Sequence, residues 1–440
     1  MPTTAEQLHH LSAEQRARLA ARLRSKYDRK DTSEPIAIVG MAARLPGAAN
    51  VTEFWDLLRT GDSAVGPPPP GRQGDRPGGY LSDIAHFDAE YFQISPREAA
   101  SLDPQQRLLL ETASDALHDA GIEAGSVAGS RVGTFMGLMH DDYGRIGAEQ
   151  GHIDGHFVTG TNPSLAAGRL AYVFDFHGPA ITINTACSSS LVAMHLARQS
   201  LLLGECDLAL SGGGNLLLHP DSTLMYEQAG ALSRTGACHT FDASADGYVR
   251  GEGVGVVVLR RLSDALVAGD VVHGVVRGSG VNQDGRSAGL TAPSGEAQWR
   301  LVSGVVEGAG LRAGDVGYVQ AHGTGTPLGD PLELRALARA LSVGRGEGGR
   351  LAVSSVKTCV GHLEAAAGVA GLIAAVLAVR EGVIPPHRHL ARPNPLVAWD
   401  GLGVVVPSVA MPWVVTDGPR RAAVSSFGIS GTNAHAIIEQ

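Results

Sequence analysis

Short apolar runs alternate with amphipathic stretches along most of this chain. The run PIAIVGM, which begins at Pro35, is followed by a segment closed by proline and glycine, as expected of a buried strand and a loop. Residues 103–122 place apolar side chains at helical spacing and are closed by Gly121, which predicts an amphipathic helix. Further strand-like runs alternate with helical ones: RVGTFMGL, AITINTA, CDLALSGG, GVGVVVLRRL, VGYVQAHG and LAVSSVKT. This alternation predicts an α/β fold.

The same pattern divides the body of the chain into two long stretches. Residues 34–265 and residues 266–440 each contain strands separated by helices. This favours two similar α/β halves packed together, although the letters alone do not establish a duplication. Between the first strand and the first long helix, GPPPPGRQGDRPGG is too rich in proline and glycine for regular structure, so we expect a surface loop there.

Residues 1–33 form a separate N-terminal unit. Ser12 and Gln15 fit a helix-start capping box, and Leu19, Leu23 and Tyr27 recur every four residues along an arginine-rich stretch. The spacing predicts an amphipathic helix. Two interpretations remain open: a docking or linker helix that meets a neighbouring domain or chain, and a helix packed on its own domain.

Composition narrows the class of protein. A chain of 440 residues with 44% hydrophobic residues can bury a substantial core. No run approaches the roughly 18 apolar residues of a membrane span, and the N-terminus lacks a secretory signal, so we expect a cytoplasmic protein without a membrane partner. The net charge of −9 argues against nucleic-acid binding.

The cysteines are widely spaced and have no zinc-site pattern, so we expect neither a disulfide framework nor a bound metal. Cys187 stands out, because an apolar run ends there and a helical run, SLVAMHLARQSLL, begins just after it. A thiol at a helix N-terminus is favoured as thiolate, which lowers its pKa and suits a nucleophile. The alternative is one more buried small residue, which is also the interpretation of Cys206 and Cys238. Cys359, beside the loop that carries His362, is a second candidate nucleophile.

Two histidines lie in glycine-containing turns. His322 follows the strand-like VGYVQA, and His362 precedes an alanine-rich helix. Lys357 is the single lysine of residues 34–440 and lies five residues before His362. A thiol that holds an acyl group and two neutral imidazole donors that stabilise an enolate would together permit condensation of thioesters. A structural role for each histidine remains the alternative.

Two further segments carry candidate ligand contacts. Thr324 and Thr326 alternate along HGTGT and can hydrogen-bond a polar ligand arm, or else satisfy their own turn. Phe427 lies in SSFGISG, a glycine-broken loop that can act as an aromatic gate or simply as a turn.

The motifs, taken in order, resemble the ketosynthase domains of modular type I polyketide synthases, within the thiolase-fold condensing enzymes. The resemblance covers residues 34–440 and rests on these segments: PIAIVGMAARLPG, SPREAASLDPQQRLLLE, TACSSSLVA, FDASADGYVRGEG, VNQDGRSAGLTAP, AHGTGTPLGDPLE, SSVKTCVGHLEAAAGVAGL and SSFGISGTNAH. It implies a thiolase-like duplicated five-layer αβαβα sandwich, usually a homodimer.

The resemblance also implies roles. Cys187 would accept the growing acyl chain, while His322 and His362 would promote decarboxylation of a malonyl-type extender, with Lys357 supporting the histidines. The backbone N–H groups of Cys187 and Phe427 would form the oxyanion hole. Thr324 and Thr326 would hold a phosphopantetheine arm.

The expected partners are acyl carrier proteins, one donating the acyl chain and one loaded with the extender. The domain itself would bind no cofactor, because the carrier supplies the phosphopantetheine. A neighbouring synthase subunit could dock on the N-terminal helix. Since no acyltransferase or carrier sequence follows, the extender would come from a carrier encoded elsewhere, or the chain is part of a longer synthase.

Two other functions compete with elongation. A non-elongating acyl-transfer ketosynthase usually lacks the histidine of HGTGT, but His322 is present. A noncatalytic dimerisation scaffold usually lacks the cysteine, but Cys187 is present. The sequence therefore favours the elongating enzyme, an acyltransferase that forms carbon–carbon bonds.

Overall fold

The computed structural model describes residues 12–26, 34–72, 74–345, 349–415 and 418–440. Its strands are β1 (Ile36–Arg44), β2 (Val65–Gly66), β3 (Gly78–Gly79), β4 (Val132–Gly137), β5 (Ala180–Ile183), β6 (Leu208–Asn215), β7 (Gly253–Arg261), β8 (Gly274–Gln283), β9 (Tyr318–Gln320), β10 (Leu351–Ser354), β11 (Val383–Ile384), β12 (Val404–Val405), β13 (Met411–Pro412), β14 (Arg421–Phe427) and β15 (Thr432–Glu439). Its α-helices are α2 (Ala13–Lys26), α3 (Val51–Thr60), α4 (Pro96–Ser101), α5 (Pro104–Asp119), α6 (Asp142–Glu149), α7 (Phe157–Thr161), α8 (Leu165–Phe174), α9 (Ser189–Leu203), α10 (Pro220–Gln228), α11 (Leu262–Ala268), α12 (Gly295–Gly308), α13 (Gly329–Leu341), α14 (Lys357–Val360) and α15 (Ala367–Glu381). Short 3-10 helices are η1 (Ala124–Val127), η2 (Ala313–Asp315) and η3 (Glu364–Ala366).

The same strand arrangement occurs twice in one continuous sheet. The order is β12-β10-β9-β14-β15-β8-β1-β7-β6-β4-β5, and the two halves meet where β1 pairs with β8. In the N-terminal half, β4 lies parallel to β5 and β6, and β7 lies antiparallel to β6 and β1. In the C-terminal half, β9 lies parallel to β10 and β14, and β15 lies antiparallel to β14 and β8. The duplication that the sequence suggested is therefore present in the topology.

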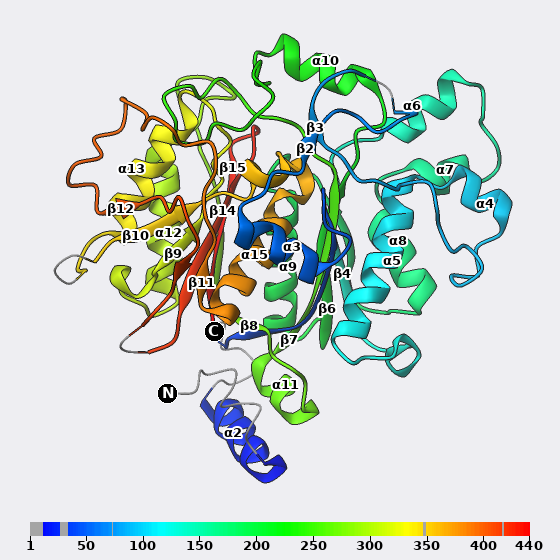
Figure 1. Ribbon diagram of the computed structural model, residues 1–440. Helices are drawn as coiled ribbons and strands as arrows, with labels where there is room; N and C mark the ends of the chain where they lie inside the picture. Colours follow the sequence, from blue (N-terminus) through cyan, green and yellow to red (C-terminus); the bar gives the residue numbers. More distant parts are fainter. Residues whose placement is uncertain (1–11, 27–33, 73, 346–348, 416–417) are drawn as a thin grey trace.

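Helices complete the five layers of a thiolase-like αβαβα sandwich. The central helices α9 and α15 contact each other between the two halves of the sheet (Figure 1). Helices α5 and α8 cover the outer face of the N-terminal half, and α12 covers that of the C-terminal half with α13 packed beside it (Figure 1). In each half the central helix follows the second of the parallel strands, since α9 follows β5 and α15 follows β10. The predicted fold class is thus confirmed.

Burial explains why α15 occupies the centre. Its first thirteen residues, AGVAGLIAAVLAV, are all buried, and a helix that is apolar all round belongs in an interior layer. Its small side chains also let neighbouring backbones approach, as at Gly368, where a Cβ would lie 2.7 Å from the Leu191 nitrogen of α9. Separate apolar clusters fill the two outer interfaces, between α5, α8 and the first half-sheet and between α12, α13 and the second.

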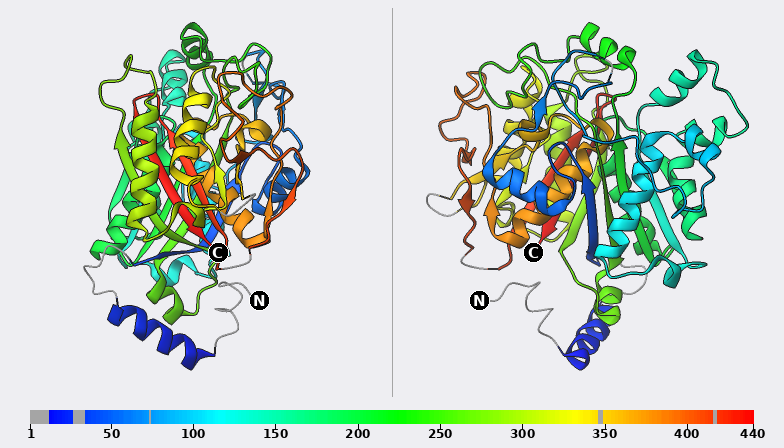
Figure 2. Two further views of the ribbon diagram at one scale, coloured as in Figure 1. Left: turned by 90° about the vertical axis from the view of Figure 1, so that its left-hand side faces the viewer. Right: turned by 45° about the vertical axis from the view of Figure 1, so that its right-hand side comes forward.

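The N-terminal helix begins with the predicted capping box. The Ser12 N–H donates to Gln15 Oε1 at 2.8 Å, and the Gln15 N–H donates to Ser12 Oγ at 3.2 Å. Helix α2 packs against α11, away from the layered body, and buries Ala20 (Figure 2). Leu19 and Leu23 are half-buried, whereas Tyr27 lies outside the described residues. The helix thus packs on its own chain, and its docking role stays a prediction.

Two local predictions are also confirmed. The helix expected at 103–122 is α5, whose N-cap Asp103 accepts a hydrogen bond from the Gln105 N–H at 2.8 Å. The proline-rich stretch forms an irregular, partly exposed loop between β2 and β3. Among the described residues, no helix has the length and apolar character needed to span a membrane.

Candidate active site

Cys187 lies in the tight turn between β5 and the central helix α9. Ala186, just before it, has a φ of 56°, a left-handed conformation that costs a non-glycine residue roughly 1–2 kcal/mol. Asn184 Oδ1 stabilises the turn by accepting the Ala186 N–H at 3.0 Å, and the Thr185 N–H donates to Ser189 Oγ at 2.9 Å. The strained turn therefore holds Cys187 at the wall of an internal cavity.

The loop after β14 supplies backbone groups to this thiol. The backbone N–H groups of Ile429 and of Cys187 itself act to lower the pKa of the thiol, and Ser426 Oγ donates to the Cys187 carbonyl at 2.7 Å. The sequence pointed instead to the N–H of Phe427. Phe427 is the last residue of β14 and pairs with Asn433 of β15. Ile429 is thus a candidate backbone donor that the sequence did not indicate, and the role of the Phe427 N–H stays a prediction.

The surroundings of Cys187 disfavour the thiolate. Burial, followed by the nearby Glu364 carboxylate, raises the pKa of the thiol to about 12, against a lowering effect of Lys357. The lowered pKa expected from the helix start is therefore wrong in direction, because desolvation of a buried thiolate outweighs the helix N-terminus. The thiolate has to form during the reaction.

His362 occupies the corresponding turn of the C-terminal half, between β10 and α15. Gly361 before it has a φ of 76°, and a Cβ there would lie 3.1 Å from the backbone oxygens of Val249 and Arg250, so this position requires glycine. His362 Nδ1 accepts the Glu364 N–H at 3.0 Å, which leaves the ring proton of the neutral imidazole on Nε2. Nε2 is buried without a partner among the described residues and is a donor available to a ligand.

His322 follows β9 and is held through its backbone. Glu333 of α13 accepts the N–H groups of His322 and Gly323 at 2.7 and 2.8 Å. Lys357 Nζ donates to the His322 carbonyl at 2.5 Å, so the lysine acts on the histidine loop and not on a ring nitrogen. The ring of His322 stands edge-on to that of His362, with centroids 5.5 Å apart and planes at 84°.

Both imidazoles are neutral at neutral pH. Burial lowers the pKa of His322 and of His362 well below the usual value, and the Lys357 charge acts in the same direction. His322 Nδ1, like His362 Nε2, has no hydrogen-bond partner within the described parts of the chain. The Phe427 ring packs on His322 with centroids 5.5 Å apart. Two neutral rings beside one thiol suit the stabilisation of a developing oxyanion.

The threonine loop is fixed by a second buried carboxylate, Asp330. One of its oxygens accepts the Gly325 and Thr326 N–H groups at 3.1 and 3.3 Å, and the other accepts the Phe241 N–H at 2.7 Å. The Thr324 and Thr326 hydroxyls lie 3.3 Å apart. Sequence reasoning missed both Asp330 and the carboxylate that holds His322, although the two acidic residues of AHGTGTPLGDPLE were the available signal.

A buried ion network underlies the site and was also missed. Arg250 Nε donates to Glu364 Oε1 at 2.6 Å, and His140 Nε2 lies 2.6 Å from Glu364 Oε2. Burial opposes ionisation of Glu364, but Arg250 and His140 hold the pKa of its carboxyl well below the usual value. Glu364 has a φ of 47°, and this strained backbone presents its N–H to His362. No local sequence pattern pairs residues so distant in the chain.

A cavity of about 180 Å³ collects the predicted residues. Its lining includes Cys187, His322, His362, Thr324, Thr326 and Phe427. Lys357 is buried behind the histidine loop and is not part of the lining. Within the described ranges, no group of three or more histidine, cysteine, aspartate or glutamate side chains is arranged to hold a metal ion.

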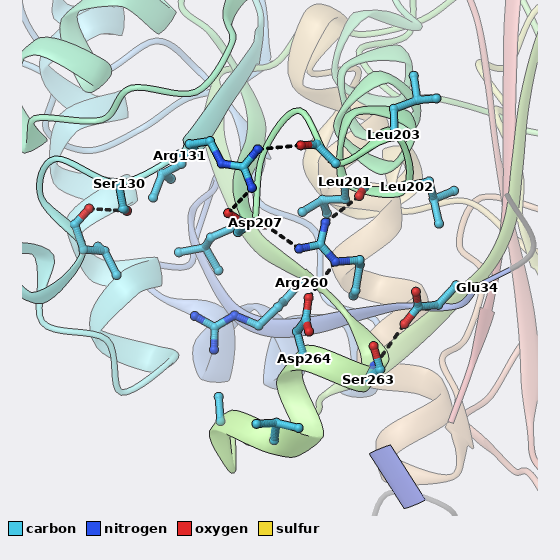
Figure 3. A pocket seen from close by; sticks show the side chains of 17 residues that line it. Glu34, Ser130, Arg131, Leu201, Leu202, Leu203, Asp207, Arg260, Ser263 and Asp264 are labelled. Carbon is cyan, nitrogen blue, oxygen red and sulfur yellow. Dashed lines mark hydrogen bonds and ion pairs between the residues drawn. The ribbon is translucent and has the colours of Figure 1, made fainter. Parts of the chain in front are cut away.

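A larger hollow of about 940 Å³ lies elsewhere, beside the end of α9 and the start of α11 (Figure 3). Several of its charged residues pair with one another: Arg131 with Asp207, and Arg261 with Asp207 and Asp264. None of the predicted site residues lines it. The smaller cavity therefore holds the candidate chemistry.

Comparison with known proteins gives consistent matches. The family model described as beta-ketoacyl synthase, N-terminal domain, matches residues 33–265, and the model for the C-terminal domain matches residues 273–391. One of the phenolphthiocerol/phthiocerol polyketide synthase subunits of Mycobacterium tuberculosis is 46% identical over 100% of this chain and 30% of its own length. Spectinabilin polyketide synthase system protein NorA' of Streptomyces orinoci is 50% identical over 92% of this chain and 12% of its own length.

Solved structures agree with these sequence matches. The ketosynthase from module 6 of the bacillaene synthase from Bacillus subtilis 168 superposes with a TM-score of 0.87 and 42% identity, covering 92% of this chain and 72% of that one. The oxazolomycin ketosynthase domain OzmH KS7 of Streptomyces albus JA3453 gives a TM-score of 0.87 and 39% identity, covering 92% and 75%. The chain spans less than a third of the length of the curated relatives described above.

Proposed function

Because the chain belongs to the β-ketoacyl synthase family and is a ketosynthase domain of the polyketide synthase type, we propose that it extends an acyl thioester by decarboxylative condensation. One observation carries the proposal. Cys187, His322 and His362 line a single cavity, and His362 Nε2 faces no protein partner there among the described residues. A thiol beside two neutral imidazoles provides both an acyl acceptor and donors for an enolate oxygen.

The first step loads the acyl chain on Cys187. Its sulfur attacks the carbonyl of an incoming thioester, the new carbon–sulfur bond forms, and the bond to the departing thiol breaks. The thiol proton of Cys187 passes to the departing thiolate. The N–H groups of Cys187 and Ile429, which lie at this sulfur, stabilise the oxyanion that develops during the transfer.

The second step consumes a malonyl-type extender. Its carboxylate leaves as carbon dioxide, and the electron pair of the broken carbon–carbon bond forms an enolate whose oxygen accepts hydrogen bonds from His322 and His362. The enolate carbon then attacks the acyl carbonyl on Cys187. The carbon–sulfur bond breaks, the Cys187 thiolate takes up a proton, and a β-ketoacyl thioester leaves. Lys357 and Glu333 act as positioning residues because both hold the backbone of His322.

Both thioesters would arrive on acyl carrier proteins. The Thr324 and Thr326 hydroxyls line the cavity close to each other and would hold the phosphopantetheine arm, which the carrier brings as part of its substrate. The arm is long and narrow, so it carries the thioester into the cavity while the carrier stays outside.

We also propose a homodimer formed through β5. This strand is one edge of the sheet, pairs within the described part of the chain only with β4, and exposes Ala180 and Ile181 without a charged residue. Such an uncovered edge is a template for a second strand. The substitution Ile181→Lys is expected to shift the protein from dimer to monomer in light scattering. An unchanged mass would contradict this mode of pairing.

Intact-mass analysis tests the proposed reaction. The purified chain, offered an acyl carrier protein donor, should gain one acyl group on Cys187 and then yield β-ketoacyl carrier protein when a malonyl carrier is added. Acylation without condensation would support the non-elongating alternative. No acylation on Cys187 with any donor would support the scaffold and overturn the proposal.

A further inference from the structure

The side chain of Gln298 carries an unused hydrogen-bond acceptor at the reaction cavity. Gln298 lies in the first turns of α12, has 2% of its surface exposed and lines the cavity. Its Oε1 has no hydrogen-bond partner among the described residues. Buried amide oxygens are nearly always paired, because leaving one unpaired after removal from water is costly. The position therefore calls for a ligand that donates a hydrogen bond.

The side-chain amides of the polar residues near Gln298 already donate hydrogen bonds to other protein groups. Asn433 Nδ2 donates to Asp284 Oδ1 at 2.8 Å and to Asn282 Oδ1 at 3.2 Å. Asn282 Nδ2 donates in turn to the Ala297 carbonyl, next to Gln298, at 2.8 Å. Asp284 and Gln298 both line the cavity, and no described lysine or arginine belongs to the lining. This wall thus offers no positive side chain to an anion, and the unpaired Gln298 oxygen favours a ligand that donates a hydrogen bond.

The position of Gln298 identifies which part of a substrate it meets. Helix α12 packs against α13, where a Cβ at Gly295 would lie 3.4 Å from Leu332 Cδ2. The start of α13 also contacts the threonine loop, since a Cβ at Gly329 would lie 2.5 Å from Thr326 Oγ1. Gln298 therefore lies on the same side of the cavity as the threonine loop. The N-terminal half supplies a different wall, in which Tyr226 and Met139 lie against each other.

We infer that Gln298 Oε1 accepts a hydrogen bond from an amide N–H of the pantetheine arm and thereby selects acyl donors whose thiol arm contains an amide. This inference rests on the proposed function, because it requires a carrier-borne thioester in the cavity. Gln298 is a specificity-determining residue in this scheme and takes no part in bond making. Pantetheine suits the site chemically because its two amide groups place N–H donors along an otherwise flexible arm.

Two acyl donors that differ in a single group of the thiol arm test the inference. The same acyl group is offered on N-acetylcysteamine, which has the amide N–H, and on 2-acetoxyethanethiol, in which an ester oxygen replaces it. The second-order rate of Cys187 acylation is measured by intact mass. The wild-type protein is expected to prefer the amide donor about five- to tenfold, the effect of one hydrogen bond. Gln298→Met, similar in size but without an acceptor, should reduce the preference to less than about twofold.

Two further variants control for structural effects. Gln298→Glu retains a side-chain acceptor and should keep the preference for the amide donor. Gln283→Met removes an exposed amide close to the cavity that is not part of its lining and whose Nε2 donates to the Ser430 carbonyl at 3.0 Å; it should also keep the preference. Thermal unfolding of each variant separates loss of fold from loss of selectivity.

The outcomes distinguish this inference from the reaction itself. Equal wild-type rates for the two donors, or a preference that survives in Gln298→Met, would overturn the role of Gln298 and leave the condensation intact. Gln298→Met could instead change the preference between β-hydroxyacyl and saturated acyl groups and leave the preference between the two thiol arms unchanged. That result would place the hydrogen-bond donor on the acyl chain and would also overturn the inference. Absence of acylation by either donor would instead overturn the proposed function.

Discussion

The two halves of the molecule place different reactive groups in the turn that precedes the central helix. In each half a parallel strand leads through a left-handed residue into a buried central helix: Ala186 precedes Cys187 and α9, and Gly361 precedes His362 and α15. The N-terminal turn carries a thiol whose pKa is raised by burial, whereas the C-terminal turn carries an imidazole whose pKa is lowered by burial. One scaffold thus brings two helix starts to one cavity, and the residue at each start decides what that half contributes.

The halves also differ in how they fix the functional residue. The nucleophile turn is stabilised by neutral side chains, Asn184 and Ser189. The His322 turn is held by buried ionisable side chains, since Glu333 and Lys357 both hydrogen-bond its backbone, and His362 accepts the backbone N–H of Glu364, a residue of the buried ion network. We therefore expect substitutions in the C-terminal half to alter pH dependence as well as rate.

Removing the Cys187 thiol, which the N-terminal half contributes, should have the largest effect on activity. In Cys187→Ala, acylation and condensation are expected to fall below detection, by at least about 1000-fold, because no other group can hold the chain covalently. Intact mass and product analysis measure both. Cys206→Ala, which changes a buried cysteine outside the cavity, should retain acylation. Undiminished product from Cys187→Ala would show that the N-terminal half does not supply the acyl acceptor.

Removing the contribution of the C-terminal half should separate the two steps. In His362→Ala we expect condensation to slow by about 10²- to 10⁴-fold, because the enolate loses a donor, while Cys187 is still acylated. Rates of acyl loading and of β-ketoacyl formation are measured separately. His118→Ala on the exposed face of α5 should change neither. Equal loss of both steps would mean that the histidine serves the nucleophile.

Breaking the ion network that joins the halves should lower stability. Arg250→Leu leaves the Glu364 carboxylate buried without its main partner, and the free energy of unfolding is expected to fall by about 3–5 kcal/mol. Glu296→Gln, which breaks exposed pairs with Arg300 and Arg339, should lower stability far less, because solvent screens these pairs. Chemical denaturation measures both. Similar costs for the two variants would contradict a special role for the buried network.

The buried carboxylate Glu333 should give the C-terminal half its pH dependence. Burial raises the pKa of Glu333 to about 7 from 4.5, so between these values the folded state binds a proton that the unfolded state has lost. Stability contributed by this group is therefore full below 4.5 and is lost as pH rises towards 7, by at most about 1.4 kcal/mol per pH unit. In Glu333→Gln, unfolding measured from pH 4.5 to 7 should show a shallower fall with pH. Parallel curves for the two proteins would contradict this.

Relieving the strain at the nucleophile should have the smallest effect. Ala186→Gly removes the steric cost of a left-handed alanine but adds backbone entropy to the unfolded chain, so we expect a gain of no more than about 1 kcal/mol in the free energy of unfolding. Ala193→Gly, inside α9, should instead destabilise the protein by about 1 kcal/mol. A loss of stability in both variants would show that the turn at Ala186 is not strained.

Much of the fold and of the site was accessible from local sequence. Hydrophobic periodicity predicted the alternating strands and helices, and the turns around Cys187, His322 and His362 were marked by a change of period or by glycine. Two features of the nucleophile were not accessible. The effect of the Ile429 N–H on the thiol depends on how the loop after β14 packs against the turn of Cys187, and the pKa of Cys187 depends on burial and on a carboxylate distant in sequence.

The sequence by itself determined the residue types, the helix starts and the succession of strands and helices along the chain, because these depend on neighbours within a few positions. Only the tertiary structure decided which partners meet: the pairing of Arg250 with Glu364, the carboxylate on the His322 backbone, and the unpartnered amide of Gln298. The physical reason is that desolvation and hydrogen bonding inside a core depend on what packs around a group. Two helix starts, far apart in the chain, acquire a shared chemistry only when the duplicated layers bury them together.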